Sequence, residues 1–347
     1  MSSGIVARTQ GARIAGVVSC VPPKTIGNDY FVERFGEKVK DVVKMTGVQN
    51  RHWVENGTTT SDLCERAANH LLDQLGWERE SLDGIIFVSQ TPDWRLPATA
   101  CSLQDRLGLR TGTIAFDISL GCSGYVYALW VAMMMIQTGA AKRLLLAVGD
   151  TSSIMNDPED RSTALLFGDA GTATVVEASD DPEDEAFFIV GTDGAGAENL
   201  IVPKGGFRGC AGHPKFADFK SDTLYMDGGE IFNFTLKAVP PLIADTLKAA
   251  GRTVDDYDLF LMHQANAFMI KHLAKKAKLP ADKVPINIDR YGNTSSATLP
   301  LLLGDDAAER LRKERLQVAL FGFGVGYSWS SASLKIGPLG CADTVIL

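Results

Sequence analysis

The sequence has no apolar run long enough to cross a bilayer and no hydrophobic leader at its start. Its longest apolar run, residues 125–136, ends at Gln137, whereas a spanning helix needs about 20 such residues. The first ten residues, MSSGIVARTQ, have no hydrophobic core of the kind that a secretory signal carries. These absences predict a cytoplasmic protein with no membrane partner.

Paired cysteines and an excess of basic residues are missing as well. The six cysteines, at positions 20, 64, 101, 122, 210 and 341, form no C-x-x-C pair and show no metal-ligand spacing. The 34 basic residues are outnumbered by 42 acidic ones, and a net charge of −8 excludes the broad basic surface that wraps nucleic acid. We therefore expect reduced cysteines, no metal site and no nucleic-acid partner.

What the chain does contain is an alternation of strand-like apolar runs and helical patterns over 347 residues, 45% of them hydrophobic. This alternation predicts an α/β fold, and the length favours two domains or one large duplicated unit. The acidic, proline-containing stretch at 178–185 is typical of a solvated turn. We place a boundary there, between an N-terminal half over residues 1–180 and a C-terminal half over residues 181–347.

A weak internal repeat relates the two halves. DGIIFVSQ (83–90) resembles YDLFLMHQ (257–264), and FDISLGCSG (116–124) matches INIDRYGNTS (286–295). Each segment of the second pair is expected to be a strand, a turn of small residues and a helix start. Ligand sites in α/β sheets lie at the carboxyl ends of strands, so a pseudo-twofold would bring Cys122, His263 and Asn293 together.

Each of these three residues has an ordinary structural interpretation beside the chemical one. Cys122 precedes a segment that is apolar on all sides, and it is either an inert core cysteine or a thiol that a helix dipole favours as thiolate. His263 follows a buried strand and is a satisfied core histidine or a catalytic one. Asn293, before Thr and Ser, suits a helix cap. Together the three are far more specific than any one alone.

The glycine-rich stretch FGFGVGYSW (321–329) is similar to a dinucleotide-binding fingerprint. That fingerprint requires a following helix and an acidic residue about 20 residues later, whereas a strand-like run to Lys335 follows here. The stretch is better suited to present backbone N–H donors to a substrate oxygen.

In this order and at these spacings, the motifs resemble the β-ketoacyl-ACP synthase III family, which has the thiolase fold. The resemblance implies two similar halves that pack a five-layered αβαβα core, and a homodimer. The matching segments cover nearly the whole chain: TGVQNRH (46–52), DISLGCSG (117–124), DRSTALLFGDAG (160–171), HQAN (263–266), YGNTSSA (291–297) and GVGYSW (324–329).

The resemblance also implies catalytic roles. Cys122 would attack an acyl thioester and carry the acyl group, while the amides of Cys122 and Gly326 would form the oxyanion hole. His263 and Asn293 would hydrogen-bond the carbonyl of a malonyl thioester, with malonyl-ACP as the expected form, and stabilise the enolate left when CO₂ departs. The product would be a β-ketoacyl chain for fatty acid or secondary-metabolite biosynthesis. Neutral donors suit an enolate, and neither a metal nor a redox cofactor is expected.

Substrate contacts are implied in the same way. Arg161 keeps its place in the DR-T motif, but the Trp and Arg that hold CoA in the fatty-acid-priming enzymes are replaced by Asp41 and Met45. Acyl-ACP therefore competes with acyl-CoA as the expected donor. Asn266, in HQAN, is expected to contact the substrate.

Carrier docking is expected on the helix that follows HQAN. Phe268 replaces an Arg that docks the acyl carrier protein in the family, and we include it among the substrate-binding positions. A basic face at helical spacing remains for the acidic carrier, although a merely solvated face fits equally well. Its residues are Lys271, Lys275 and Lys276.

Leu96, directly before Pro97, stands where the priming enzymes carry a Phe that closes the acyl pocket of the neighbouring subunit. The smaller side chain predicts that medium or branched acyl chains are accepted. Relatives that condense two long chains or close pyrones tend to carry a Glu near this position as a base. Leu96 cannot serve as that base, whereas the neighbouring Asp93 keeps this alternative open.

Two further alternatives stay open. An acyltransferase that moves an acyl group to an alcohol or amine needs Cys122 but no decarboxylation. A non-catalytic partner subunit of a heterodimer needs neither, although such subunits usually lose the cysteine or the histidine, and this chain keeps Cys122, His263 and Asn293.

Overall fold

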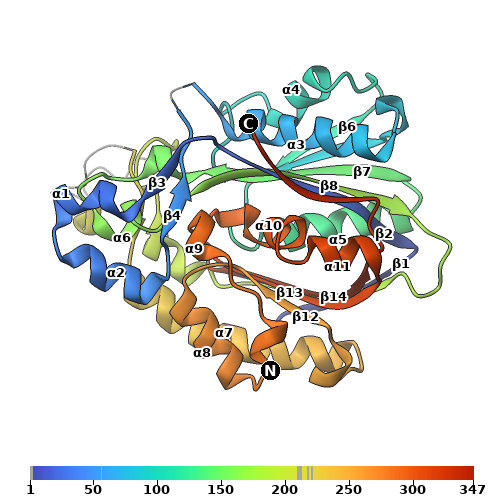
Figure 1. The fold of residues 1–347 in the computed structure, drawn as a ribbon. Helices are drawn as coiled ribbons and strands as arrows, with labels where there is room; N and C mark the ends of the chain where they lie inside the picture. The colour runs from blue at the N-terminus through green and yellow to red at the C-terminus, as the bar shows by residue number, and fades with distance from the viewer. Residues whose placement is uncertain (1–2, 56, 209–212, 217–218, 220–221) are drawn as a thin grey trace.

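The structure is a computed structural model that describes residues 3–55, 57–208, 213–216, 219 and 222–347, and two β-sheets in it alternate with layers of helices (Figure 1). The six-stranded sheet has the order β15-β2-β8-β7-β5-β6. Its strands are β15 (Cys341–Ile346), β2 (Ala12–Val21), β8 (Asp169–Ala178), β7 (Arg143–Thr151), β5 (Gly84–Val88) and β6 (Ile114–Ile118).

The five-stranded sheet has the order β1-β9-β14-β13-β12. Its strands are β1 (Ile5–Gln10), β9 (Glu185–Thr192), β14 (Ser328–Ile336), β13 (Leu316–Gly324) and β12 (Leu259–Met262). Two small two-stranded sheets complete the strands: β3 (Thr25–Gly27) with β4 (Asn50–His52), and β10 (Leu200–Ile201) with β11 (Tyr225–Met226).

The helices form three layers around the two sheets, which gives the predicted αβαβα order of the thiolase fold (Figure 1). The outer face of the six-stranded sheet carries α3 (Thr60–Leu75) and α4 (Thr99–Arg106), and the outer face of the five-stranded sheet carries α7 (Gly228–Ala249) and α8 (Ala267–Lys276). Between the sheets lie α5 (Gly124–Gln137), α10 (Thr298–Gly304) and α11 (Ala308–Lys313). Four short helices complete the described chain: α1 (Val32–Phe35), α2 (Lys38–Thr46), α6 (Arg161–Ala164) and α9 (Ile288–Tyr291).

The uniform apolarity of α5 explains its place in the middle layer. A helix with a single apolar stripe covers one sheet, whereas a helix that is apolar on every side can be packed on both sides. The core around α5 joins residues of both sheets, among them Val88 and Leu146 from one and Leu261 and Leu320 from the other. This packing fixes Cys122, which directly precedes α5, at the junction of the two sheets.

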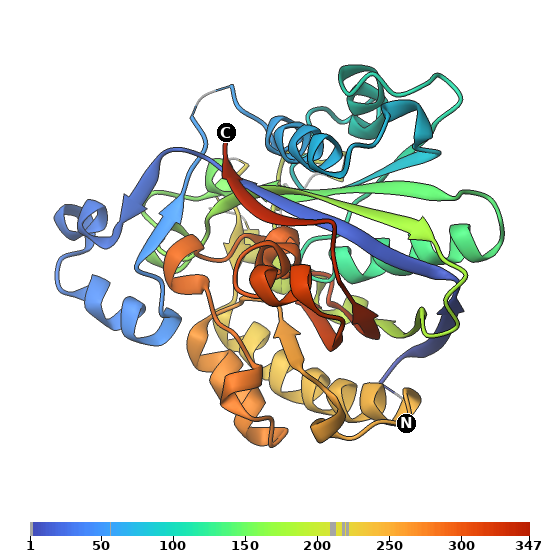
Figure 2. The ribbon, with the colours of Figure 1, turned by 45° about the vertical axis from the view of Figure 1, so that its right-hand side comes forward.

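The two sheets exchange their edge strands at the ends of the chain. β1 pairs antiparallel with β9, so the first strand belongs to the five-stranded sheet, while β15 pairs in parallel with β2 of the six-stranded sheet. The acidic stretch at 178–185 is the predicted turn, since β8 ends at Ala178 and β9 begins at Glu185. Apart from these two edge strands, the six-stranded sheet is built from residues before that turn and the five-stranded sheet from residues after it. Figure 2 shows the two ends of the chain on opposite sides of the molecule.

One expected strand is absent. The segment at 286–289, matched to β6 by the internal repeat, forms no strand in the described chain, and α9 begins at Ile288. Ile288 is instead buried in a small cluster with Val48 and Phe167, and the amide of Asn287 donates to the side chain of Gln264. These tertiary contacts outweigh the alternating pattern of INIDRY, so the five-stranded sheet ends at β12.

None of the helices in the described ranges is both long and apolar enough to cross a membrane. Five of the six cysteines are free thiols, and Cys210 lies outside the described residues.

Candidate functional site: a buried cysteine between two cavities

Cys122 lies in the turn between β6 and α5 and is 7% exposed. Burial raises the pKa of its thiol to about 11, against hydrogen bonds from the backbone of Val325, the Ser295 side chain and its own amide, which lower it. The nearby Asp150 carboxylate raises this pKa further. Loss of hydration thus outweighs the favourable donors, and the pKa of the thiol lies above its ordinary value, whereas a helix dipole acting alone would lower it.

The second backbone donor at the sulfur belongs to Val325 and not to the expected Gly326. Gly324, the last residue of β13, packs directly on Cys122, and a Cβ built on it would lie 2.7 Å from the sulfur. Because β13 approaches so closely at Gly324, the next amide along the chain is the one that faces Sγ. The two amides at the sulfur are thus those of Cys122 and Val325.

His263 follows β12 directly and is 2% exposed. Burial lowers the pKa of its imidazole to about 3, so the ring is neutral near pH 7. Its Nδ1 lies 2.8 Å from the hydroxyl oxygen of Thr298, which also donates to the Ser295 carbonyl at 3.0 Å. With Nδ1 held in this way, Nε2 is the ring atom left for a substrate.

Asn293 is 5% exposed and lies just before the short turn Ser295–Ala297 that leads into α10. Its Oδ1 accepts a hydrogen bond from the Ser295 amide at 2.9 Å, which is the capping contact expected of an Asn in this position. The carbonyl oxygen of the side chain is therefore occupied, and the NH₂ group is the end available as a donor to a ligand.

Ser295 contacts all three of these residues, and sequence reasoning did not single it out. Its amide donates to Asn293, its side chain hydrogen-bonds Cys122, and its backbone carbonyl hydrogen-bonds the His263 ring. The backbone of Ser295 has φ of 52°, in the left-handed region that residues other than glycine rarely adopt. Such backbone strain persists where surrounding contacts enforce it and is concentrated at functional sites. The run of small residues in YGNTSSA is the feature of the sequence that could have indicated the role of Ser295.

Two cavities meet at Cys122, with Phe167 and Leu200 as their other shared wall residues. The first has a volume of about 640 Å³ and also contains His263 and Asn293. Its remaining lining is mostly apolar, and Arg161 is its one charged side chain among the described residues. Cys122, His263 and Asn293 thus share one desolvated space, as the repeat predicted.

The second cavity lies on the other side of Cys122, has a volume of about 290 Å³, and is more polar. Four polar side chains of the N-terminal half line it, together with Ser295. These four residues are Gln90, Ser119, Asp150 and Ser152.

The expected substrate contacts are placed around the first cavity. Arg161, Met45, Asn266 and Phe268 all line it, whereas Asp41 does not. Asn266 also caps α8, since its Oδ1 accepts the Met269 amide at 2.7 Å.

The lysines of the expected carrier-docking face lie further along α8. All three are exposed, and none forms an ion pair with a carboxylate in the described part of the chain. Phe268, on the first turn of the same helix, is half exposed and stacks on Phe232 with ring centroids 6.2 Å apart. The lysines, Lys271, Lys275 and Lys276, therefore lie further along the helix whose first turn lines the first cavity, and they do not line it themselves.

Leu96 lines neither cavity of its own chain. It is 78% exposed and borders a shallow hollow on the surface with Trp94 and Pro97. The expected contact of Leu96 with an acyl chain therefore requires a second copy of the protein.

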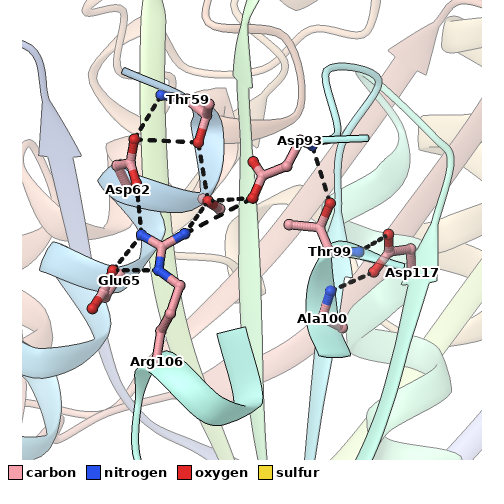
Figure 3. Close-up of polar contacts among 9 residues, drawn as sticks. Thr59, Asp62, Glu65, Asp93, Thr99, Ala100, Arg106 and Asp117 are labelled. Atoms are coloured by element: carbon pink, nitrogen blue, oxygen red, sulfur yellow. Dashed lines mark hydrogen bonds and ion pairs between the residues drawn. The ribbon is translucent and has the colours of Figure 1, made fainter. Parts of the chain in front are cut away.

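Asp93 is turned inward, as Figure 3 shows, toward the guanidinium of Arg106. Its Oδ2 accepts the Ser61 hydroxyl at 2.8 Å and lies 3.8 Å from Arg106, and its side chain is 5% exposed. Arg106 also pairs with Asp62 and Glu65, while Asp117 accepts the amides of Thr99 and Ala100 at the start of α4 (Figure 3). Asp93 therefore anchors this loop and lines neither cavity at Cys122, which argues against its use as a catalytic base.

Known proteins share this sequence and architecture. Residues 116–194 match the family model of 3-oxoacyl-[acyl-carrier-protein (ACP)] synthase III, and residues 247–336 match the model of its C-terminal part. A β-ketoacyl-ACP synthase III of Xanthomonas campestris is 37% identical over 93% of this chain and 98% of its own length. One from Caldanaerobacter subterraneus is 34% identical over 93% and 97%.

Solved structures agree with these matches. A 3-oxoacyl-ACP synthase of Burkholderia xenovorans superposes with a TM-score of 0.97 at 59% identity and covers 100% of both chains. The priming β-ketosynthase of the R1128 polyketide pathway superposes with a TM-score of 0.83 at 25% identity, over 95% of this chain and 97% of that one.

Proposed function

We propose, because the chain belongs to the 3-oxoacyl-ACP synthase III family, that it is a condensing enzyme which loads an acyl group on Cys122 and extends it with a malonyl thioester. The observation that carries this proposal is the meeting of Cys122, His263 and Asn293 in one cavity. The product is a β-ketoacyl thioester, as in fatty acid or secondary-metabolite biosynthesis.

In the first step, the Cys122 sulfur attacks the carbonyl carbon of the acyl thioester and its proton passes to Nε2 of His263. The C–S bond to the leaving group then breaks, and the leaving thiol takes that proton. The amides of Cys122 and Val325, which face the sulfur in the resting site, hold the negative charge on the acyl oxygen. Because burial keeps the thiol protonated, the proton transfer accompanies the attack.

In the second step, a malonyl thioester enters the first cavity and loses CO₂. The resulting enolate oxygen accepts hydrogen bonds from Asn293 Nδ2 and from a protonated Nε2 of neutral His263. The enolate carbon then attacks the acyl group on Cys122, a carbon–carbon bond forms, and the C–S bond to the enzyme breaks. The released Cys122 thiolate takes a proton from solvent, which restores the resting thiol. The apolar lining of the cavity strengthens both hydrogen bonds because little water competes for them.

Thr298 is the positioning residue that permits both roles of His263. A hydroxyl has one proton, so when Thr298 donates to the Ser295 carbonyl, Nδ1 carries the ring proton and Nε2 accepts. In the other tautomer the hydroxyl donates to Nδ1 and the ring proton lies on Nε2, which donates to the enolate; between the two steps Nδ1 loses its proton and Nε2 takes one from solvent. A neutral ring with a low pKa suits this exchange of tautomers.

The first cavity favours an acyl group delivered on the carrier protein. Met45 and Phe268 place apolar atoms at its mouth, and Arg161 alone among the described lining residues offers a cation for the phosphates of CoA. The exposed lysines of α8 beside the mouth suit an acidic carrier protein. None of these steps calls for a metal or a redox cofactor, since each bond change uses only the thiol, the imidazole and the amides.

We include a homodimer in this proposal. Leu96 and Trp94 are large apolar residues that are 78% and 54% exposed, which is typical of a surface covered by a partner. In a dimer, Leu96 of one subunit would border the acyl cavity of the other and leave more room there than a Phe would.

The proposal is tested by following CO₂ release and product formation from malonyl-ACP and an acyl donor. The wild-type protein is expected to form a β-ketoacyl product with one CO₂ per condensation. Cys122→Gln, which cannot carry an acyl group, is expected to release CO₂ without condensation. Acyl transfer to alcohols or amines with no CO₂ release by either form would contradict a decarboxylating mechanism.

A further inference from the structure

The second cavity is lined by several polar side chains, and some of them form no hydrogen bond with the protein groups that the structure describes. Gln90 follows β5 and folds over Gly121, where a Cβ would lie 2.2 Å from its Oε1. Glycine at this position therefore leaves the space that the carboxamide occupies, one residue before Cys122. Since neighbouring Cα atoms lie 3.8 Å apart, the side-chain oxygen of Gln90 lies within roughly 8 Å of the Cys122 Cα.

The side chains of Gln90, Ser119 and Ser152 line the cavity. Gln90 and Ser119 are exposed and Ser152 is buried, and none of the three side chains has a hydrogen-bond partner among the described residues. Ser152 is 3% exposed, so its hydroxyl depends on the cavity for a partner. A purely hydrocarbon chain in this space would displace water from these groups and return no hydrogen bond, which costs free energy.

The buried carboxyl group of Asp150 determines whether the second cavity can accept a charged acyl group. It is 1% exposed, its Oδ1 accepts the Gln90 amide at 2.7 Å, and its Oδ2 accepts the Ser296 hydroxyl at 2.6 Å. No cationic side chain lines this cavity among the described residues. A second anion placed here would be repelled at low dielectric, so carboxylated acyl groups are disfavoured.

The apolar part of the lining includes Met155, Phe167, Leu224 and Val325. An occupant with both a polar and an apolar part satisfies both kinds of lining residue. We propose that the second cavity accepts a short acyl chain with an uncharged hydroxyl or carbonyl group within its first few carbons, which Gln90 and Ser152 bind. This inference rests on the proposed function, because it assigns the acyl group that Cys122 carries.

The test compares pantetheine thioesters that differ in one group: butanoyl, both enantiomers of 3-hydroxybutanoyl, 3-oxobutanoyl and succinyl. Pantetheine avoids the choice between CoA and carrier protein. Intact-protein mass spectrometry follows the adduct on Cys122 over time. The variants are Gln90→Leu and Ser152→Ala, and the matched control is Gln74→Leu on the exposed face of α3.

Wild-type protein is expected to react about fivefold faster with one 3-hydroxy enantiomer or the 3-oxo thioester than with butanoyl, as one net hydrogen bond predicts, and slowest with succinyl. Gln90→Leu is expected to lose this preference, so that the 3-hydroxy, 3-oxo and butanoyl thioesters react at similar rates, whereas a general structural lesion would slow every substrate alike and leave the preference in place. Gln74→Leu is expected to behave as wild type.

The test distinguishes a failure of this inference from a failure of the proposed function. If adducts form but butanoyl is preferred, or if Gln90→Leu and Ser152→Ala both leave the preference unchanged, the polar-acyl inference is wrong and the proposed function stands. If no thioester acylates Cys122, the proposed function fails and takes this inference with it.

Discussion

The two cavities beside Cys122 share three wall residues yet differ in chemistry. The larger one is walled mostly by apolar side chains and holds two neutral groups, the imidazole of His263 and the carboxamide of Asn293. The smaller one is lined by the polar side chains of Gln90, Ser119 and Ser152 and by the buried carboxyl group of Asp150.

This difference assigns a separate task to each side of the sulfur. Negative charge develops on the larger side when a malonyl thioester loses CO₂, and neutral donors in an apolar space stabilise such charge without repelling the substrate. The smaller side holds a chain that does not react, so its polar groups select the acyl substrate. Ser295 lies where the two spaces meet and hydrogen-bonds residues of both.

The largest expected effect comes from removing a hydrogen-bond donor that lines only the larger cavity. Asn293→Ala is expected to slow decarboxylation of malonyl-ACP by about 10²–10³-fold, because the enolate loses one donor in a water-poor site. Acylation of Cys122, followed by mass spectrometry, should change little. Asn69→Ala on α3 serves as the matched control. If Asn293→Ala slowed acylation of Cys122 as much as decarboxylation, the two cavities would not serve separate steps.

The second effect concerns the sulfur between the cavities. Burial raises the pKa of Cys122 to about 11, so its alkylation by iodoacetamide is expected to rise about tenfold per pH unit from pH 7 to pH 9, with no plateau. Ser295→Ala removes a hydrogen bond that lowers this pKa, so the thiolate fraction and the rate should fall at every pH. The exposed Cys101 provides an internal reference for the reagent. A plateau near neutral pH would contradict a protonated resting thiol.

A third, smaller effect is expected at Thr298. Thr298→Val removes the hydroxyl at Nδ1 of His263 and should slow both acylation and decarboxylation about tenfold, as the loss of one hydrogen bond near a reacting group predicts. Thr298→Ser should restore both rates, because it returns the hydroxyl. The pH profile of kcat/KM should also change in the Val variant alone. Full activity of Thr298→Val with an unchanged profile would remove Thr298 from the mechanism.

The smallest expected effect concerns the apolar mouth of the larger cavity. Met45→Arg places a second cation near Arg161 and is expected to raise the use of acyl-CoA relative to acyl-ACP about threefold, the size of an exposed ion pair. Met45→Leu is the control that keeps the mouth apolar. Competition between the two donors in one reaction gives the ratio directly. A wild-type preference for acyl-CoA would contradict the proposed carrier-bound donor.

The five layers were predicted from the family resemblance, whereas local signals made the three central residues predictable. The run after Cys122 is apolar on all sides, which favours a helix packed on every face, and the internal repeat aligned the turns that carry Cys122 and Asn293. His263 and Asn293 follow from the same repeat. Both lie where predicted, His263 directly after β12 and Asn293 at the turn before α10.

Other features depend on contacts that no local pattern records. The position of Val325 rather than Gly326 at the sulfur is a shift of one residue, set by the close packing of Gly324 on Cys122. Ser295 owes its central place to an unusual φ and to partners distant in sequence. The pairing of β1 with β9 and of β15 with β2 likewise depends on contacts between segments that lie far apart in the sequence. The inward turn of Asp93 depends on Arg106, thirteen positions further along the chain.

The most direct test of the account is the mass of the protein after brief incubation with an acyl thioester and proteolytic mapping of the adduct. The account predicts one acyl group per chain, on the peptide that contains Cys122, absent from Cys122→Ala and released when malonyl-ACP is added. An adduct on another residue, or an acyl group on Cys122 that malonyl-ACP does not discharge, would contradict it.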